Sequence, residues 1–282
     1  PLQLSVKGLK GGHSGLEIDK GRGNAIKILN RVILALDEVG GRLSGFNGGN
    51  KRNAIPREAD AVVYVPKKKL VEAMKIVVSC NDTMRAELST VEPDLAISAV
   101  EAKGLKKGSV IKPAQQEMIT RTISALPHGV IKMSADIPGL VETSTNVAVI
   151  NTTKKAVVLA TSQRSSVASE NSEICHTVAS IFLLGEAKVA QSDGYPGWKP
   201  NLESNILKLA KKTYKELYGR EPEVKAIHAG LECGIIGEKY PGIDMVSFGP
   251  TLEGVHSPDE KIHIDTVDKF WKFLLAILKN VN

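Results

Sequence analysis

Three of the six histidines stand in loop sequences where an imidazole could do chemistry: His13, His228 and His256. His256 follows a predicted strand that ends near Phe248, and α/β proteins bind ligands beyond the carboxyl ends of their strands. An imidazole in that position can ligate a metal ion or carry a proton. From spacing alone, a surface-loop histidine without such a role is an equally good interpretation.

His13 is flanked by glycines in the sequence Gly11-Gly12-His13-Ser14-Gly15. The loop has neither the Lys-Ser/Thr ending of a phosphate-binding loop nor the Gly-x-Gly-x-x-Gly spacing of a dinucleotide-binding fold. Glycines permit backbone conformations that other residues avoid, so they let the chain turn and present the imidazole. We therefore expect His13 to be the functional group of this loop.

His228 and Glu232 are four residues apart where a predicted strand runs into a helix, so they could share one face. They do not form the His-Glu-x-x-His motif of zinc peptidases, because alanine follows His228. Spacing alone favours a structural role over a functional one for this pair. Cys233 has no obvious base beside it, and we expect a small packed side chain there rather than a nucleophile.

His263 and Asp265, separated by one residue, match a short pattern that many dinuclear zinc enzymes use. The surrounding residues are charged and lead into the final helix, where Asp265 is well placed as the N-cap. We therefore interpret the match as coincidental. No pair of adjacent glutamates occurs in the sequence to supply a general base beside a metal ligand.

The elements that position these residues fall into two sets within the first 192 residues. Apolar periodicity predicts a strand at 2–7, helices at about 25–36 and 70–88, and strands before residue 47, at 61–65 and at 95–100. A second set follows, with helices at about 113–125 and 171–185 and strands near 129–134, 145–151, 156–162 and 188–191. Helices that alternate with hairpins predict an α+β layer of the ferredoxin-like type, and a duplicated layer is the expectation for the second set.

A turn-rich stretch at 193–200 marks a boundary in the chain. Beyond it the pattern predicts helices at 203–218, 232–238 and 266–280 and strands at 224–227 and 245–248. This αβαβα order is typical of part of a doubly wound sheet. We therefore expect an α/β protein with two domains, residues 1–192 and 193–282.

Composition and charge exclude several classes of protein. With 42% hydrophobic and 24% charged residues, the 282-residue chain has the composition of a globular protein. No run of about 18 apolar residues predicts a transmembrane helix, so no membrane partner is expected. The net charge of the chain is +6, and its excess of basic residues lies in the first 192 residues, which hold 25 basic and 18 acidic residues (+7). The lysine runs lie beside turns without interleaved aromatic residues, so solvated turns explain them better than a nucleic-acid surface.

The three cysteines are Cys80, Cys175 and Cys233, which are far apart and form no Cys-x-x-Cys pair. An odd number of distant cysteines argues against a disulfide framework and against a structural zinc site. It is typical of a protein in a reducing cytoplasm.

Five segments of the chain together resemble a known family. They are GLKGGHSG at 8–15, NAIPREA at 53–59, QRSS at 163–166, HAGLECG at 228–234 and GPTLEGVHSPDE at 249–260. In this order they are similar to the dinuclear zinc peptidases that include carnosinase, aminoacylase and the aminoacyl-histidine dipeptidases. The resemblance spans the whole chain, and it is specific because five segments carry it.

The resemblance implies a two-domain hydrolase in which a lid domain interrupts a zinc-binding α/β catalytic domain. Residues 1–192 resemble the lid, through which a homodimer would form, and residues 193–282 resemble the C-terminal segment of the catalytic domain. The family's His-x-Asp and Glu-Glu motifs precede the lid and are not in this sequence. The chain is therefore expected to be a C-terminal fragment that is inactive alone, and a non-catalytic dimerisation or interaction module is the alternative.

The resemblance also implies roles for individual residues. His256 matches the C-terminal zinc ligand of the family, and His13 and Arg164 match lid residues that act on the scissile carbonyl and its transition state. The residues that resemble substrate-binding positions are Asn53, Gly230 and Glu232. The intact enzyme would use two zinc ions and a metal-activated water to hydrolyse Xaa-His and other dipeptides in the cytoplasm.

Overall fold

The computed structural model describes residues 1–102, 108–192, 194, 196–198, 201–225, 232–253 and 260–281. We call residues 1–192 the sheet region and residues 193–282 the C-terminal region. The first elements of the sheet region include β1 (Leu2–Lys7), α1 (Ala25–Asp37), β3 (Arg42–Gly48), β5 (Ala59–Tyr64), α2 (Leu70–Glu87) and β6 (Ala96–Glu101). Their strands are antiparallel in the order β6-β1-β5-β3, which together with the two helices confirms the predicted ferredoxin-like layer.

The second set of elements extends this sheet. It comprises α3 (Pro113–Ala125), β7 (Gly129–Met133), β8 (Val141–Thr152), β9 (Val157–Ser165) and α4 (Ala168–Leu184). Because Gly48 of β3 pairs with Ile150 of β8, all these strands belong to one seven-stranded sheet. The expected duplication is wrong, because the second set runs helix, three strands, helix and so does not repeat the element order of the first. The strand expected at 188–191 is also wrong, because that segment forms no strand pairing within the described residues.

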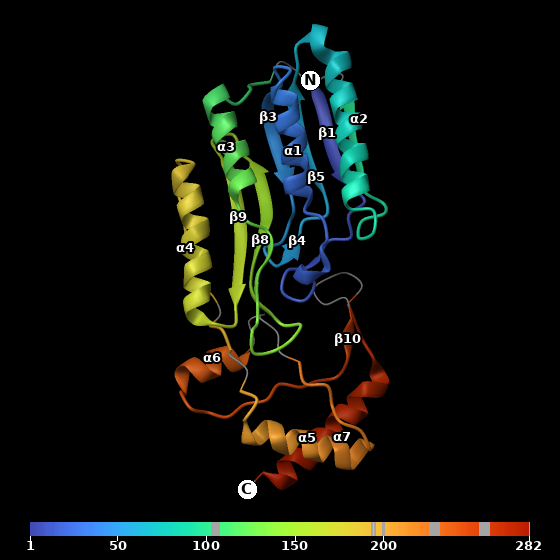
Figure 1. The fold of residues 1–282 in the computed structure, drawn as a ribbon, viewed down its shortest axis with the longest axis vertical. Coiled ribbons are helices and arrows are strands. Elements are labelled where there is room, and N and C mark those ends of the chain that lie inside the picture. Colours follow the sequence, from blue (N-terminus) through green and yellow to red (C-terminus); the bar gives the residue numbers. More distant parts are fainter. Residues whose placement is uncertain are drawn as a thin grey trace.

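Helices α1 to α4 form one layer against the sheet (Figure 1). α1 packs between α2 and α3, while α4 packs against α3 and β9. Side chains of the helices and the strands form one buried cluster, in which Leu29 and Ile33 of α1 and Phe46 of β3 are almost fully buried. The sheet region therefore has a continuous apolar core.

Asn24 starts the central helix and joins it to the second half of the sheet. Its side-chain oxygen accepts hydrogen bonds from the N–H groups of Ile26 and Lys27, which satisfies two unpaired donors of the first turn. Its amide donates to the carbonyl of Val147 on β8 at 2.8 Å. The N-cap of α1 is thus also a contact between the two sets of elements.

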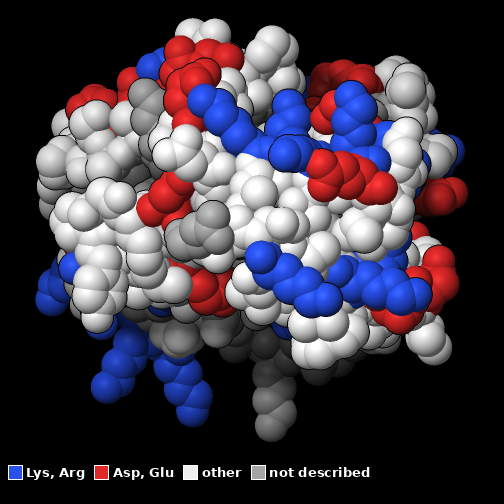
Figure 2. Space-filling view, turned by 90° about the horizontal axis from the view of Figure 1, so that it is seen from below, with Lys and Arg blue, Asp and Glu red and all other residues white. Residues whose placement is uncertain are grey.

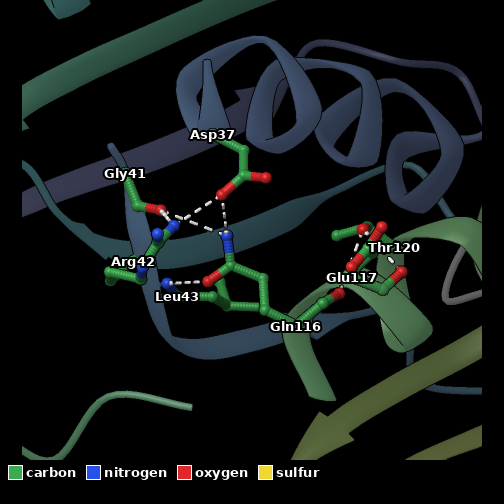
Figure 3. Close-up of polar contacts among 7 residues, drawn as sticks. All are labelled: Asp37, Gly41, Arg42, Leu43, Gln116, Glu117 and Thr120. Atoms are coloured by element: carbon green, nitrogen blue, oxygen red, sulfur yellow. Dashed lines mark hydrogen bonds and ion pairs between the residues drawn. The ribbon is translucent and has the colours of Figure 1, made fainter. Parts of the chain in front are cut away.

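Gln116 of α3 makes a buried polar joint between the same two sets (Figure 3). Its side-chain oxygen accepts from the Leu43 N–H at 2.7 Å, and its amide donates to the Asp37 carboxylate at 2.9 Å and to the Gly41 carbonyl at 3.1 Å. Arg42 donates to the same carboxylate at 2.6 Å. Since only 2% of Gln116 is exposed, these bonds replace the water that burial removes, and they fix α3 on α1 and β3.

The C-terminal region contains α5 (Asn205–Tyr218), α6 (Glu232–Lys239), the short strands β10 (Leu252–Glu253) and β11 (Lys261–Ile262), and α7 (Ile264–Asn280). The three helices agree with the sequence prediction, but the strand expected at 245–248 is not formed, and 224–225 is not a strand. The rest of the strand expected at 224–227 lies outside the described residues. An extended segment becomes a strand only beside a neighbour that shares its hydrogen bonds, and the described residues pair none with 245–248.

His263 is the N-cap of α7, so the expectation that Asp265 has this role is wrong. The N–H of His263 donates to the Thr251 carbonyl at 3.0 Å, which extends the β10–β11 pairing up to the start of the helix. The imidazole lies 2.9 Å from the Glu253 carboxylate on the facing strand. Asp265 lies in the first turn instead, where a carboxylate still interacts favourably with the helix dipole.

Figure 2 shows the end of the molecule that α5 and α7 form, where basic and acidic side chains are interspersed. Lys208 pairs with Glu203, and Lys272 pairs with Asp268, each at 2.6 Å. The basic groups of this end are therefore partly neutralised by neighbours. No helix in the described ranges is both long enough and apolar enough to cross a membrane.

Candidate active site

His13 and Asn53 are brought together by a two-residue pairing below the main sheet. His13 lies on β2 (Gly12–His13), which pairs with β4 (Ala54–Ile55) so that His13 faces Ala54. One residue further on, the Ser14 N–H donates to the Asn53 carbonyl at 2.9 Å. Two segments that lie 40 positions apart in the sequence thus share one small surface.

Arg164 reaches the same surface from strand β9. It is the penultimate residue of β9, where it pairs with Ser144 of β8, and its Nε donates to the Ser14 hydroxyl at 3.3 Å. Burial lowers the pKa of the Arg164 guanidinium, because a charged group loses hydration there. An arginine nevertheless keeps its proton, so a partly desolvated positive charge stands beside the His13 loop.

The orientation of the His13 ring follows from its contact with the next turn. The N–H of Gly15 donates to the Nδ1 atom of His13 at 3.2 Å. A neutral imidazole that accepts a hydrogen bond at Nδ1 carries its proton on Nε2. His13 is therefore set to act as a hydrogen-bond donor through Nε2.

Asn146 of β8 is a member of this surface that the motifs do not identify. Its amide donates to the carbonyls on either side of Asn53, at 2.8 Å to Ala54 and at 3.4 Å to Arg52. The side-chain oxygen of Asn146 is buried and accepts no hydrogen bond from the described residues. A polar run at 143–146 inside a buried strand was the available signal, since buried strands are usually apolar.

The C-terminal region approaches this surface through two closely packed glycines. A Cβ atom on Gly197 would lie 2.9 Å from the carbonyl oxygen of Ser165, the last residue of β9, and one on Gly234 of α6 would lie 2.4 Å from the carbonyl of Pro196. The segment at 196–197 is therefore held between the end of β9 and α6. Glu232, the first residue of α6, is exposed.

Three further residues of the sequence prediction cannot be placed. His228, Gly230 and His256 lie outside the described residues. Within the described ranges, no three histidine, cysteine or acidic side chains come together as metal ligands would. Of the site residues predicted from the sequence, the structure therefore brings His13, Asn53 and Arg164 to one surface.

All three cysteines are free thiols. Burial is the main factor that raises the pKa of Cys80, Cys175 and Cys233. A raised pKa disfavours the thiolate, which is the reactive form of cysteine. This finding agrees with the interpretation of Cys233 as a packed side chain.

Comparison with known proteins first gives a family match for part of the sheet region. Residues 4–92, from β1 to beyond α2, match the family described as peptidase dimerisation domain. The chain is also 40% identical over 281 residues, 99% of its length, to the cytosol non-specific dipeptidase of Escherichia coli (strain K12). The crystal structure of aminoacylhistidine dipeptidase from Vibrio alginolyticus matches all of the chain with a TM-score of 0.86, also at 40% identity.

The chain is thus similar along nearly its whole length to two dipeptidases, in agreement with the resemblance of its five segments. It spans 58% of the Escherichia coli protein and 57% of the Vibrio protein.

Proposed function

We propose that this chain supplies the lid and one metal ligand of a zinc-dependent dipeptidase that hydrolyses Xaa-His and other dipeptides. The contact between Arg164 and Ser14 carries this proposal, because it brings a half-buried cation to the loop of His13. The names of the two relatives support the substrate class. In this proposal residues 1–192 are the lid, and residues 193–282 are the C-terminal segment of the catalytic domain.

The described side chains act on the carbonyl group of the scissile bond. As water adds to that carbonyl, its oxygen becomes negatively charged, and His13 and Arg164 donate hydrogen bonds to it. One such donor is worth about 3 kcal/mol in a site that excludes water. Asn53 holds the substrate from the neighbouring segment, while Gly230 and Glu232 contribute at the substrate pocket. Closure of a lid brings these donors to the substrate only after it has bound.

Zinc is the cofactor that we propose for the intact enzyme, with His256 as the ligand from this chain. A catalytic zinc ion usually has three protein ligands, and the described residues present no group of three. The described residues alone do not fit such a site, so we derive no step through the metal. We infer that the 282 residues by themselves hydrolyse no dipeptide.

A chimera tests this proposal. The 282 residues replace the matching portion of the Escherichia coli dipeptidase, and carnosine or another Xaa-His dipeptide is the substrate. We expect turnover by the chimera with zinc and none by the 282-residue chain. His13→Ala and Arg164→Met should each lower kcat about 100-fold to 1,000-fold, since each removes one oxyanion donor. Lys20→Ala, an exposed change near the same loop, is the control.

Full turnover in the His13→Ala chimera would contradict the assigned role. A folded chimera without any turnover would contradict the proposed activity. Turnover by the 282-residue chain alone would contradict the inference that it is inactive.

We also propose a homodimer through the lid, as the match to a dimerisation domain suggests. β6 ends the strand order of the sheet, and valines on β6 and on the adjacent α2 are exposed: Val71, Val78 and Val100. Val78→Asp should convert a dimer to a monomer in sedimentation velocity, whereas Val158→Asp, at an exposed valine of β9, should not. A monomeric unsubstituted chain would contradict this proposal. The relative's description as cytosolic and the free cysteines support a cytoplasmic location.

A further inference from the structure

The loop that presents His13 contains an ion pair that the proposed reaction does not use. Glu17 and Arg22 face each other across the loop, with 2.8 Å between Oε1 of Glu17 and Nη2 of Arg22. Their side chains are 35% and 22% exposed, so the pair is partly shielded from water. Partly shielded ion pairs hold geometry better than freely solvated surface pairs.

Each partner also holds a backbone group next to His13. The second carboxylate oxygen of Glu17 accepts from the His13 N–H at 2.8 Å, and Nη1 of Arg22 donates to the Gly11 carbonyl at 2.5 Å. The pair thus binds the backbone on both sides of Gly12. The contacts require the absence of a side chain there, because a Cβ on Gly12 would lie 2.4 Å from Nη1 of Arg22 and 2.8 Å from Oε2 of Glu17.

The same turn also contacts the imidazole ring of His13. The carbonyl of His13 accepts from the N–H groups of Leu16 and Glu17, at 3.2 and 2.9 Å, which closes a tight turn. Within that turn, the Gly15 N–H meets Nδ1 of His13. The position of the Gly15 N–H relative to the ring therefore depends on the backbone that Glu17 and Arg22 hold.

We propose that the Glu17–Arg22 ion pair positions His13, by holding the loop backbone so that Gly15 donates to Nδ1 and the proton stays on Nε2. Glu17 and Arg22 are positioning residues and do not touch the substrate. The inference rests on the proposed function in one respect: a protonated Nε2 is the donor that His13 needs to stabilise the oxyanion of the scissile carbonyl. Its test uses a signature of the ring itself, which does not require catalysis.

The test uses the 282-residue chain labelled with ¹⁵N in its histidines. Long-range ¹H–¹⁵N correlation spectra report the tautomer of each imidazole, and the His13→Gln variant assigns the signals of His13. We expect the unsubstituted chain to show the Nε2-protonated tautomer. Glu17→Ala and Arg22→Ala should each shift His13 toward an average of the two tautomers. Asp19→Ala, which breaks the exposed Lys20–Asp19 pair in the same loop, should leave the spectrum unchanged.

Hydrogen exchange of the His13 amide gives a second readout. We expect Glu17→Ala to accelerate this exchange about tenfold or more, because the amide loses its acceptor. The effects of Glu17→Ala and Arg22→Ala on the tautomer should not add in the double variant, since both remove one pair. If Glu17→Ala does not fold, Arg22→Lys takes its place: it retains the charge but loses the fork that reaches two oxygens, and it should produce the same averaging.

An unchanged His13 tautomer in the Ala variants, or in Arg22→Lys, would overturn the inference. So would an equal response of His13 to Asp19→Ala. Failure of the proposed function looks different: the chimera would keep its turnover after His13→Ala, while the spectra could still show the effect of Glu17 and Arg22. In an active chimera, Glu17→Ala should lower kcat with little change in KM, as expected for an interaction made only in the transition state.

Discussion

The sheet region and the C-terminal region contain similar kinds of helices but bury them to very different extents. In the sheet region one cluster joins α1 to α4 with the strands, and Leu29 and Phe46 are fully buried in it. In the described C-terminal region the buried cluster consists of Ala210, Phe273 and Ile277. The sheet region therefore has a much larger apolar core, whereas α5 and α7 depend on a few aromatic contacts.

The two faces of α7 show what this difference means. Phe273 is 8% exposed and packs against Tyr214 of α5, with 5.3 Å between the ring centroids. On the other side Ile264, Trp271 and Leu278 are 82%, 55% and 62% exposed, at a spacing that forms one stripe along a helix. An exposed apolar stripe adds no burial free energy, so we expect the C-terminal helices to open more readily than the sheet region.

The largest expected effect comes from the core of the sheet region. Phe46→Ala removes a fully buried ring and should lower the free energy of unfolding by about 3–5 kcal/mol, because a cavity remains. Phe273→Ala in the small aromatic cluster should cost less, since neighbouring side chains there can relax toward solvent. Hydrogen exchange measured by region under increasing denaturant gives both values. Equal losses would contradict the contrast between the two regions.

Gln116→Ala tests the polar joint of the sheet region. It leaves the Leu43 N–H buried without its acceptor and should lower the free energy of unfolding by roughly 2–3 kcal/mol. The matched control is Gln115→Ala, whose exposed side chain should change stability by less than about 0.5 kcal/mol. Urea denaturation of both variants provides the comparison. A Gln116 variant as stable as the control would mean that the joint does not hold α3 in place.

Acid should weaken the sheet region selectively through His128. The ring accepts from the Asn24 amide at 3.3 Å, and burial, with a smaller effect of the Lys27 charge, lowers its pKa to about 4. The unfolded chain binds this proton below about pH 6.5, whereas the folded chain binds it only near pH 4. Stability is therefore complete above pH 6.5 and falls as the pH drops toward 4, by about 2 kcal/mol at pH 5.

The measurement for His128 is the free energy of unfolding between pH 7 and pH 5. His128→Gln should remove this part of the pH dependence, and His176→Gln, at an exposed histidine of α4, should retain it. A His128→Gln variant with the original slope would place the acid sensitivity elsewhere.

Local sequence patterns were sufficient to predict the helices, but they predicted contacts between distant segments less well. The bounds of α3 agree with the prediction at both ends, because apolar spacing and Pro113 at the first turn are local features. Two results depend on which strands pair: the absence of a strand at 245–248 and the joining of both sets of strands in one sheet. Apolar periodicity does not specify strand pairing. The acceptor role of Gln116 toward Leu43, 73 positions away, has no local signal either.

The candidate site divides in the same way. The resemblance of short segments identified His13, Asn53 and Arg164. For His13, the flanking glycines were a second and physical reason to expect a functional role. The link from Arg164 to Ser14 joins residues 150 positions apart, and only the folded sheet brings them together. Asn146 could have been predicted as an unusual polar residue in a buried strand. Its hydrogen bonds to the carbonyls on either side of Asn53 could not have been predicted from the sequence.

The smallest expected effect is on the exposed face of α7. Trp271→Lys should change the free energy of unfolding by less than about 0.5 kcal/mol, because its side chain is already 55% exposed. Ile277→Lys, on the buried face of the same helix, places a charge among aromatic rings and should separate α7 from α5. Hydrogen exchange of the α5 and α7 amides measures both effects. A large loss of unfolding free energy in Trp271→Lys would contradict this expectation. It would show that the apolar stripe is buried in solution against residues outside those that the structure describes.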